Sequence, residues 1–147
     1  MTTMKLFVVT IVLAILSSAY GKIFTKCELA NVLFNNGFPK SQIPDWICIA
    51  EHESAFNTKA INRQNDDGSV DYGIFQINSR YWCSEDSTPG KECNVTCEEL
   101  LDDDIRDSLA CIKIIYNVHH FHAWVAWRNK CDGKPLPSIS ECFRGDL

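Results

Sequence analysis

The sequence lacks an apolar run long enough to cross a bilayer. The longest one, residues 6–16, is shorter than the about 20 residues that a membrane-spanning helix needs. Basic residues are also scarce, with 14 Lys and Arg against 19 Asp and Glu, and nucleic-acid binding depends on clustered Lys and Arg. We therefore expect neither a membrane nor a nucleic-acid partner. Repeats, linkers and low-complexity tracts are missing too, and the length of 147 residues favours one folded domain.

The N-terminal segment has the pattern of a secretory signal peptide. Lys5 is its only charge, an apolar run follows, and the small residues Ala19 and Gly21 come three and one positions before a suitable cleavage point. We expect a signal peptide at 1–21 and a secreted, extracellular domain at 22–147. That domain has 13 basic and 19 acidic residues, which gives a net charge of -6.

All eight cysteines lie after the predicted signal peptide. An even count in an extracellular protein indicates four disulfides, although the count alone allows 105 pairings. Cys93 and Cys97 also have a spacing compatible with a zinc site, and three histidines lie within residues 119–122. An oxidising compartment favours disulfides over this zinc alternative. The eight residues are Cys27, Cys48, Cys83, Cys93, Cys97, Cys111, Cys131 and Cys142.

The local patterns predict an α+β fold in which helices and strands are segregated along the chain. Thr25 and Glu28 have the spacing of a capping box, and Asp67-Gly68 is a hairpin-turn signal. Trp46 and Trp127 are expected in the core. Such an order can place a cleft between a helical part and a sheet part. The expected elements are helices at 26–35, 44–54, 104–116 and 124–129, with a small antiparallel sheet within 60–78.

Two acidic residues have contrasting surroundings. Glu53 ends an apolar helix, whereas Asp71 lies among the hydrogen-bonding residues Asn65, Ser69 and Asn78. Burial would raise the pKa of Glu53, and hydrogen bonds to the charged form would keep Asp71 ionised. A proton donor and a carboxylate facing each other are what glycosidic cleavage requires. Among 19 acidic residues, however, a Glu and an Asp chosen this way are more often surface groups.

Four segments make the chain resemble a known family over nearly all of its mature part. They are residues 26–30 (Lys-Cys-Glu-Leu-Ala), 53–58 (Glu-Ser-Ala-Phe-Asn-Thr), 71–83 and 123–131. Together with the cysteine register, they resemble the animal c-type lysozymes, a family that also includes the non-catalytic α-lactalbumins. The segment between the first two cysteines looks short, as in the arthropod branch.

The resemblance implies a lysozyme-like fold, with a helical subdomain and a small antiparallel sheet subdomain flanking a cleft. It implies that Glu53 is the general acid and that Asp71 attacks or stabilises the sugar cation. Trp124 matches the residue that makes the pocket of the acid apolar. Asn65 and Asn78 match the amides that hydrogen-bond the aspartate.

Further expectations follow from the same resemblance. The implied substrate-binding residues are Asn65, Gln76, Asn78, Tyr81, Trp82, Ala123 and Trp124. The implied disulfides are Cys27–Cys142, Cys48–Cys131, Cys83–Cys97 and Cys93–Cys111. The implied activity is a retaining, antibacterial or digestive hydrolysis of the β-1,4 bonds in bacterial peptidoglycan, by a monomer without a cofactor. Chitin oligosaccharides are a further candidate substrate, and a lactalbumin-like binding or regulatory protein is the rival function.

One loop departs from the calcium-binding pattern of some family members. Asp102, Asp104 and Asp107 match ligand positions, but Ser108 replaces the last carboxylate. Calcium affinity increases with the number of carboxylate ligands, so we expect no bound metal. Asn94 begins a glycosylation sequon between two cysteines, and its occupancy stays open.

Charge also bears on the conditions of activity. Three histidines within residues 119–122 are expected near the rim of the cleft, where their charge at acidic pH could attract an anionic wall, although such residues are more often ordinary surface groups. The acidic residues lose charge under the same conditions. Because bacterial walls are anionic, a mature chain of net charge -6 is repelled at neutral pH. We therefore expect a pH optimum nearer 5 than 7, which suits digestion better than defence in a neutral fluid.

Overall fold

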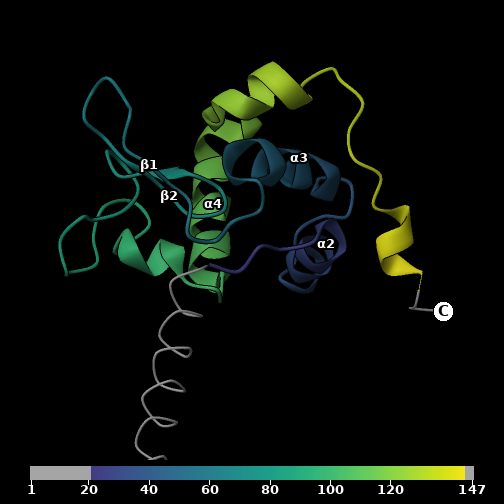
Figure 1. Cartoon of the computed structure of the whole chain (residues 1–147), viewed down its shortest axis with the longest axis horizontal. Coiled ribbons are helices and arrows are strands. Elements are labelled where there is room, and N and C mark those ends of the chain that lie inside the picture. The colour runs from purple at the N-terminus through teal and green to yellow at the C-terminus, as the bar shows by residue number, and fades with distance from the viewer. Residues whose placement is uncertain (1–20, 145–147) are drawn as a thin grey trace, which may run out of the picture.

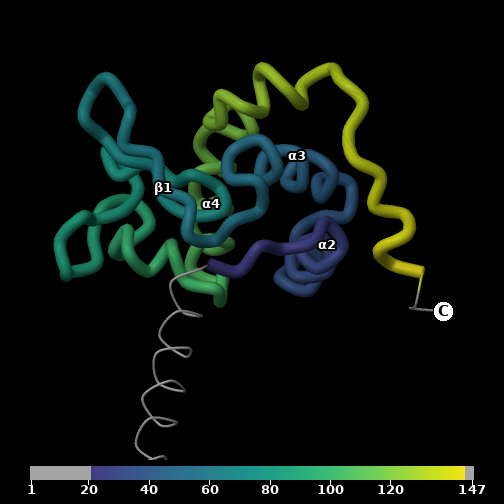
Figure 2. Tube along the Cα trace, viewed as in Figure 1, coloured from purple at the N-terminus to yellow at the C-terminus, as the bar shows by residue number. Residues whose placement is uncertain are grey.

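A computed structural model describes residues 21–144 of the chain. The predicted signal peptide lies outside the described residues, except for Gly21. Figures 1 and 2 show the helices α2 and α3 on one side and the sheet with its long loops on the other, with α4 running between them in this view. Among residues 21–144, no helix is both long and apolar enough to cross a membrane.

The first two helices begin and end close to the predicted residues. Helix α2 (Lys26–Asn35) has the expected capping box, in which Thr25 Oγ1 accepts from Glu28 N at 3.2 Å and Glu28 Oε2 accepts from Thr25 N at 2.8 Å. Helix α3 (Ile43–Ser54) has Pro44 in its first turn, where a missing N–H costs nothing. It ends at Ala55, whose φ of 50° is left-handed. Glu53 thus lies in the last turn of α3.

Three short strands form the predicted antiparallel sheet, in the order β1-β2-β3. They are β1 (Ile61–Asn62), β2 (Asp71–Tyr72) and β3 (Ile77–Asn78). Asp71 pairs with Asn62 on one side and with Asn78 on the other. Paired residues point to the same face of a sheet, so this register places two amides beside one carboxylate. The predicted turn at Asp67-Gly68 forms the tip of the loop between β1 and β2, and Gly68 there has φ of 77°.

The later helices differ from the predicted ranges. Helix α4 (Arg106–His119) begins two residues late because Asp104 stays outside, where its side chain accepts from Arg106 N at 3.2 Å. The helix predicted at 124–129 is present but shifted, since residues 125–131 are helical. Most of this segment is the π-helix η3 (Trp127–Cys131), with an i+5 bond from Asp132 N to Trp127 O of 2.9 Å, which the sequence pattern did not predict. The sequence pattern missed the short helices η1 (Glu98–Leu101), η2 (His120–Ala123) and η4 (Ser140–Phe143).

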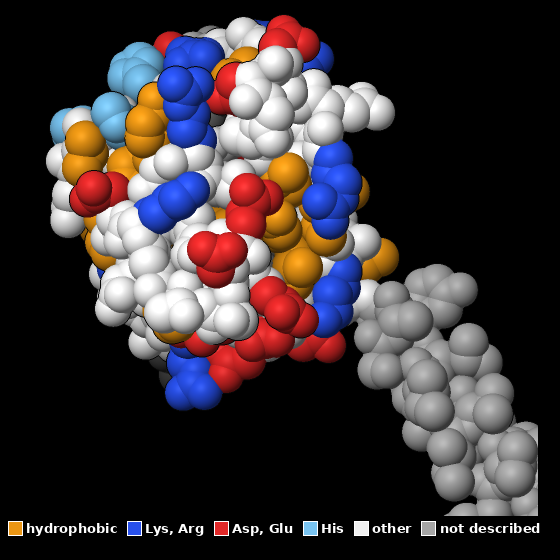
Figure 3. Space-filling view, turned by 90° about the vertical axis from the view of Figure 1, so that its left-hand side faces the viewer, with side chains coloured by type: hydrophobic (Ala, Val, Ile, Leu, Met, Phe, Trp, Pro, Cys, Tyr) orange, Lys and Arg blue, Asp and Glu red, His pale blue; other side chains and the backbone are white. Residues whose placement is uncertain are grey.

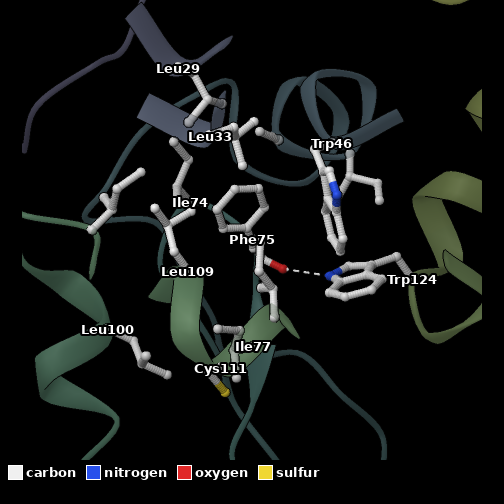
Figure 4. Packing of buried hydrophobic residues seen from close by; sticks show 14 of the residues in the cluster. Leu29, Leu33, Trp46, Ile74, Phe75, Ile77, Leu100, Leu109, Cys111 and Trp124 are labelled. Carbon is white, nitrogen blue, oxygen red and sulfur yellow. Dashed lines mark hydrogen bonds between the residues drawn. The ribbon is translucent and has the colours of Figure 1, made fainter. Parts of the chain in front are cut away.

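Trp46 is at the centre of the core and has no exposed surface. Its ring makes edge-on contacts with Phe75 at 6.0 Å, Phe121 at 4.8 Å and Trp124 at 5.0 Å between ring centroids. Figure 4 shows Trp46, Phe75 and Trp124 close together in the core, with Trp124 Nε1 donating to the carbonyl of Phe75 at 2.9 Å. Trp127 is only half-buried and stacks on Phe121 at 5.5 Å. The aromatic core therefore fixes Trp124 between α3 and the chain that leads to β3.

Four disulfides connect segments far apart in sequence. Their pairs are those implied by the family resemblance: Cys27–Cys142, Cys48–Cys131, Cys83–Cys97 and Cys93–Cys111. Since Cys93 and Cys97 are both in disulfides, the zinc alternative at these two residues is wrong. The α+β architecture with a small three-stranded sheet and four disulfides is confirmed.

Candidate active site

A cleft of about 750 Å³ lies between the end of α3, the sheet and the segment that follows α4. All nine residues expected in catalysis or substrate binding line it, although they come from distant parts of the chain. They are Glu53, Asn65, Asp71, Gln76, Asn78, Tyr81, Trp82, Ala123 and Trp124.

Glu53 is partly buried in the last turn of α3. Burial raises the pKa of its carboxyl group above the ordinary value, because the charged form loses contact with water. A hydrogen bond from Ala126 N to Oε1, at 3.3 Å, opposes this shift, and the negative charge of Asp71 adds to it. The net effect favours a protonated Glu53, as a general acid requires.

Asp71 is surrounded by amide donors. Asn78 donates to Oδ1 at 2.7 Å, while Asn65 and Asn62 donate to Oδ2 at 3.0 and 3.1 Å. Donors to both oxygens stabilise the ionised form of a carboxyl group. Ser69 contacts this group indirectly, since its hydroxyl accepts from Asn78 at 2.8 Å. The two carboxyl groups therefore have opposite environments within one cleft.

The sequence did not identify Asn62 as a partner of Asp71, because it predicted a sheet within residues 60–78 without the pairing of its strands. Asn62 precedes Asp71 by nine residues, and only the pairing of β1 with β2 brings the two together. The signal was present in the hairpin turn at Asp67-Gly68, which predicts that residues on either side of it face each other. Other cleft-lining residues lie outside the predicted set of catalytic and substrate-binding residues, although the histidines were expected near the rim of the cleft. They are Asp67, Arg80, Ile115, His119, His122, Val125 and Arg128.

Aromatic and amide side chains define the remaining surfaces of the cleft. Tyr81 is 57% exposed, and Trp82 lies beside it with a partly exposed ring. Gln76 has φ of 49°, and its amide donates to the carbonyls of Gly73 at 2.9 Å and Ala60 at 3.1 Å. Aromatic faces next to fixed polar groups are suited to binding sugar rings.

The calcium-like loop is a separate small depression of about 260 Å³ formed by Asp102, Asp104, Arg106 and Asp107. Asp104 is paired with the guanidinium of Arg106 at 2.5 Å. Burial and the nearby acidic groups raise the pKa of Asp107 above its ordinary value. Within residues 21–144, the only three His, Cys, Asp or Glu ligand atoms that gather within 4.8 Å are those of Glu141 and the Cys27–Cys142 disulfide.

A helical part and a small sheet that flank a cleft with two such unlike carboxyl groups are the arrangement of a glycoside hydrolase. Comparisons with known proteins support this class. The profile described as the C-type lysozyme/alpha-lactalbumin family matches residues 22–142. The chain belongs to this family.

Relatives from insects and from a mammal match most of the chain. Lysozyme c-1 of Anopheles gambiae is 51% identical over 144 residues, covering 95% of this chain and all of that protein. A lysozyme of Galleria mellonella is 50% identical over 121 residues, covering 82% of this chain and all of that protein. Lysozyme C-1 of Mus musculus is 43% identical over 125 residues, covering 81% of this chain and 84% of that protein.

Proposed function

We propose that the chain is a secreted muramidase that hydrolyses the β-1,4 bond between N-acetylmuramic acid and N-acetylglucosamine in bacterial peptidoglycan. The observation that carries the proposal is the pairing of Glu53, whose pKa is raised, with Asp71, held by three amides in the same cleft. One carboxyl group thus supplies a proton and the other a negative charge.

The reaction proceeds with retention. Glu53 donates its proton to the glycosidic oxygen as the bond to the anomeric carbon breaks, and the released sugar leaves as an alcohol. The carboxylate of Asp71 bonds to the anomeric carbon, or stabilises its positive charge, on the opposite face. Water then attacks this carbon while Glu53, now ionised, takes its proton, which restores both side chains.

The chain acts outside the cell as a monomer and without a cofactor. The pattern of residues 1–21 supports secretion, and the four disulfides suit an oxidising environment. Chitin oligosaccharides have the same β-1,4 linkage between N-acetylated sugars, so they are a second substrate class for the same carboxyl groups.

Replacement of Glu53 by Gln tests the proposal and separates it from a lactalbumin-like binding role. The side chain keeps its size and its oxygen for Ala126 N but loses the proton donor. We expect Glu53→Gln to clear a peptidoglycan suspension at least about a hundredfold more slowly than the parent, as is typical of a lost general acid. Glu51→Gln is the matched control, since Glu51 is an exposed glutamate on the same helix. A refolded parent that clears nothing would favour the non-catalytic role.

A further inference from the structure

Three basic side chains line the part of the cleft formed by the end of α4, η2 and η3. His119 is the last residue of α4, His122 lies in η2, and Arg128 lies in η3. All three line the cleft and are exposed. Histidine side chains gather at one corner of the face shown in Figure 3, next to lysine or arginine and hydrophobic side chains. We name His119, His122 and Arg128 the basic rim.

In the basic rim, the positive charge of Arg128 has no carboxylate partner within residues 21–144. Arg80, the other cleft arginine, is paired with Asp67 at 2.9 Å. Arg128 instead donates from Nη1 to the carbonyl of His122 at 2.8 Å, and within residues 21–144 no carboxylate lies within 4.0 Å of its guanidinium. A guanidinium held by a neutral carbonyl stays available for an anionic ligand.

The formal charge of the cleft lining depends on whether its two histidines are protonated. At neutral pH the lining has two arginines against Glu53, Asp67 and Asp71, which gives a formal charge of -1. Histidine side chains gain a proton between about pH 8 and 5. With both histidines and Glu53 protonated, the formal charge of the same lining becomes +2. The cleft can therefore attract an anionic substrate although the mature chain as a whole is acidic.

The rings of the two histidines are oriented by aromatic neighbours. His119 lies edge-on to Trp82 with 5.9 Å between ring centroids and an interplanar angle of 84°. His122 lies edge-on to Trp127 at 5.1 Å, also at 84°. Because Trp82 lines the cleft, a sugar ring packed on it would bring its substituents close to the imidazole of His119.

Other charged and titratable groups lie in the cleft or on elements that pack against those of the basic rim. One is Asp45 of α3, whose Oδ1 accepts from Nε1 of Trp127, the ring that His122 contacts, at 2.7 Å. Glu98 and Glu99 lie on η1, which meets α4 at Ser108, about three helical turns before His119. The groups that share the cleft are Glu53 from α3, Asp71 from β2, Asp67, Arg80 and Tyr81 from the loops around the sheet. Lys113 and Tyr116 lie on α4, His120 on η2, and Lys130 on η3. The test below is a ratio between two substrates, so that titrations affecting both cancel.

We propose that the basic rim binds the carboxylates of the cell-wall glycan and makes the chain select acidic over neutral N-acetylated glycans as pH falls. The inference rests on the proposed function. Peptidoglycan differs from chitin by a lactyl ether on alternate sugars, which ends in a carboxylate or is joined to a peptide with acidic groups of its own. Chitin has neither group, so the basic rim distinguishes two polymers that share one backbone.

Two matched hexamers test this selection, one of N-acetylglucosamine alone and one alternating with N-acetylmuramic acid bearing free lactyl groups. The value of kcat/KM for each is measured from pH 4.5 to 7.5 at constant ionic strength. For the parent we expect the ratio of acidic to neutral substrate to rise about tenfold from pH 7.5 to 5, because exposed charge pairs contribute a few-fold each. A ratio that does not change with pH overturns the inference.

Three kinds of variant assign the effect to the basic rim. The double variant His119→Gln, His122→Gln should lose the rise with acidity. Arg128→Gln should lower the ratio at every pH, because guanidinium charge does not change in this range. His120→Gln and His52→Gln are controls, since these exposed histidines do not line the cleft, and both should keep the rise. A double variant that behaves like the parent also overturns the inference.

A binding measurement separates this inference from the proposed function. Calorimetric titration of Glu53→Gln with both hexamers should give tighter binding of the acidic one at pH 5, whether or not the parent cleaves either. If the parent cleaves neither hexamer, the proposed function is wrong. If the two hexamers bind with equal affinity at pH 5, the proposed selection by the basic rim is wrong. A third hexamer with peptide-bearing lactyl groups shows which carboxylate is bound: weaker binding than the free-lactyl form indicates the lactyl group, and tighter binding indicates the peptide.

Discussion

Burial increases the free-energy cost of ionising Glu53. Its pKa is raised from the ordinary 4.5, so the fold favours the protonated side chain, and this stabilisation is lost as pH rises through the raised pKa. Glu53→Gln stays neutral and should therefore have a Tm above that of the parent at pH 7, with a smaller difference at pH 4. Calorimetric melting at both pH values measures this. Glu51→Gln, at an exposed glutamate of the same helix, is the control variant. A Glu53→Gln protein less stable than the parent at pH 7 would contradict this prediction.

Asn62 offers a second test at the scale of one residue. Its amide donates to Asp71 Oδ2 at 3.1 Å, and bonds to charged groups contribute about 1.5 to 3 kcal/mol. We expect Asn62→Ala to lower kcat on peptidoglycan fragments roughly tenfold or more, because the carboxylate loses part of its support. Asn117→Ala, an exposed amide outside this cleft, should keep the parent value. Parent-like turnover in Asn62→Ala would show that the other two amides suffice.

At the scale of elements, local chemistry predicted the helices whose ends have strong signals. Thr25 and Glu28 mark the start of α2, and Pro44 marks the first turn of α3. The helix predicted at 124–129 exists at 125–131, but its π geometry was not predicted because the apolar pattern does not reveal an i+5 bond. Phe34, an apolar residue of α2, is 45% exposed and meets Phe143 edge-on at 5.4 Å between ring centroids. Such outcomes depend on tertiary contacts that no local pattern contains.

The residues that line the cleft were predicted more completely than the ranges of the helices that carry them. Every catalytic or substrate-binding residue implied by the family resemblance lines the cleft, and all of them except Asn65 lie within the matched segments. Asn62, His119 and His122 lie outside those segments, whereas Arg128 lies within the last of them. Their positions follow from the register of β1 against β2 and from the left-handed break after α4, where His120 has φ of 53°. These are properties of the assembled fold.

The capping box of α2 allows a test of one element. Thr25→Ala removes the oxygen that accepts from Glu28 N, and loss of such a cap costs about 1 kcal/mol. We expect the urea midpoint of the disulfide-intact protein to fall accordingly, while activity at 25 °C stays the same because Thr25 is outside the cleft. Thr88→Ala, in an exposed loop, is the control. Equal urea midpoints for the two variants would show that the Thr25 cap does not stabilise α2.

At the scale of the whole molecule, net charge acts against cell-wall binding at neutral pH. Residues 22–147 have 13 basic and 19 acidic side chains, and bacterial surfaces are anionic. We expect whole-cell clearing to peak nearer pH 5 than 7. At pH 7, raising the salt from about 10 to 150 mM should speed clearing, since screening weakens the repulsion, whereas a basic protein would slow down. A peak above pH 7 at moderate salt would contradict the digestive interpretation.

The disulfides determine what a first proteolytic cut can do to the molecule. Cys27 and Cys142 are 115 positions apart, so both pieces of a chain cut at any point between them stay covalently joined. Residues 85–89 are exposed, and a nick there leaves Glu53 and Asp71 on one fragment and Trp124 on the other. The nicked protein would still migrate as one band until a reductant is added. In a protease-rich lumen, the two fragments that form the cleft would then separate only after the disulfides are reduced, and not when the first peptide bond is cut.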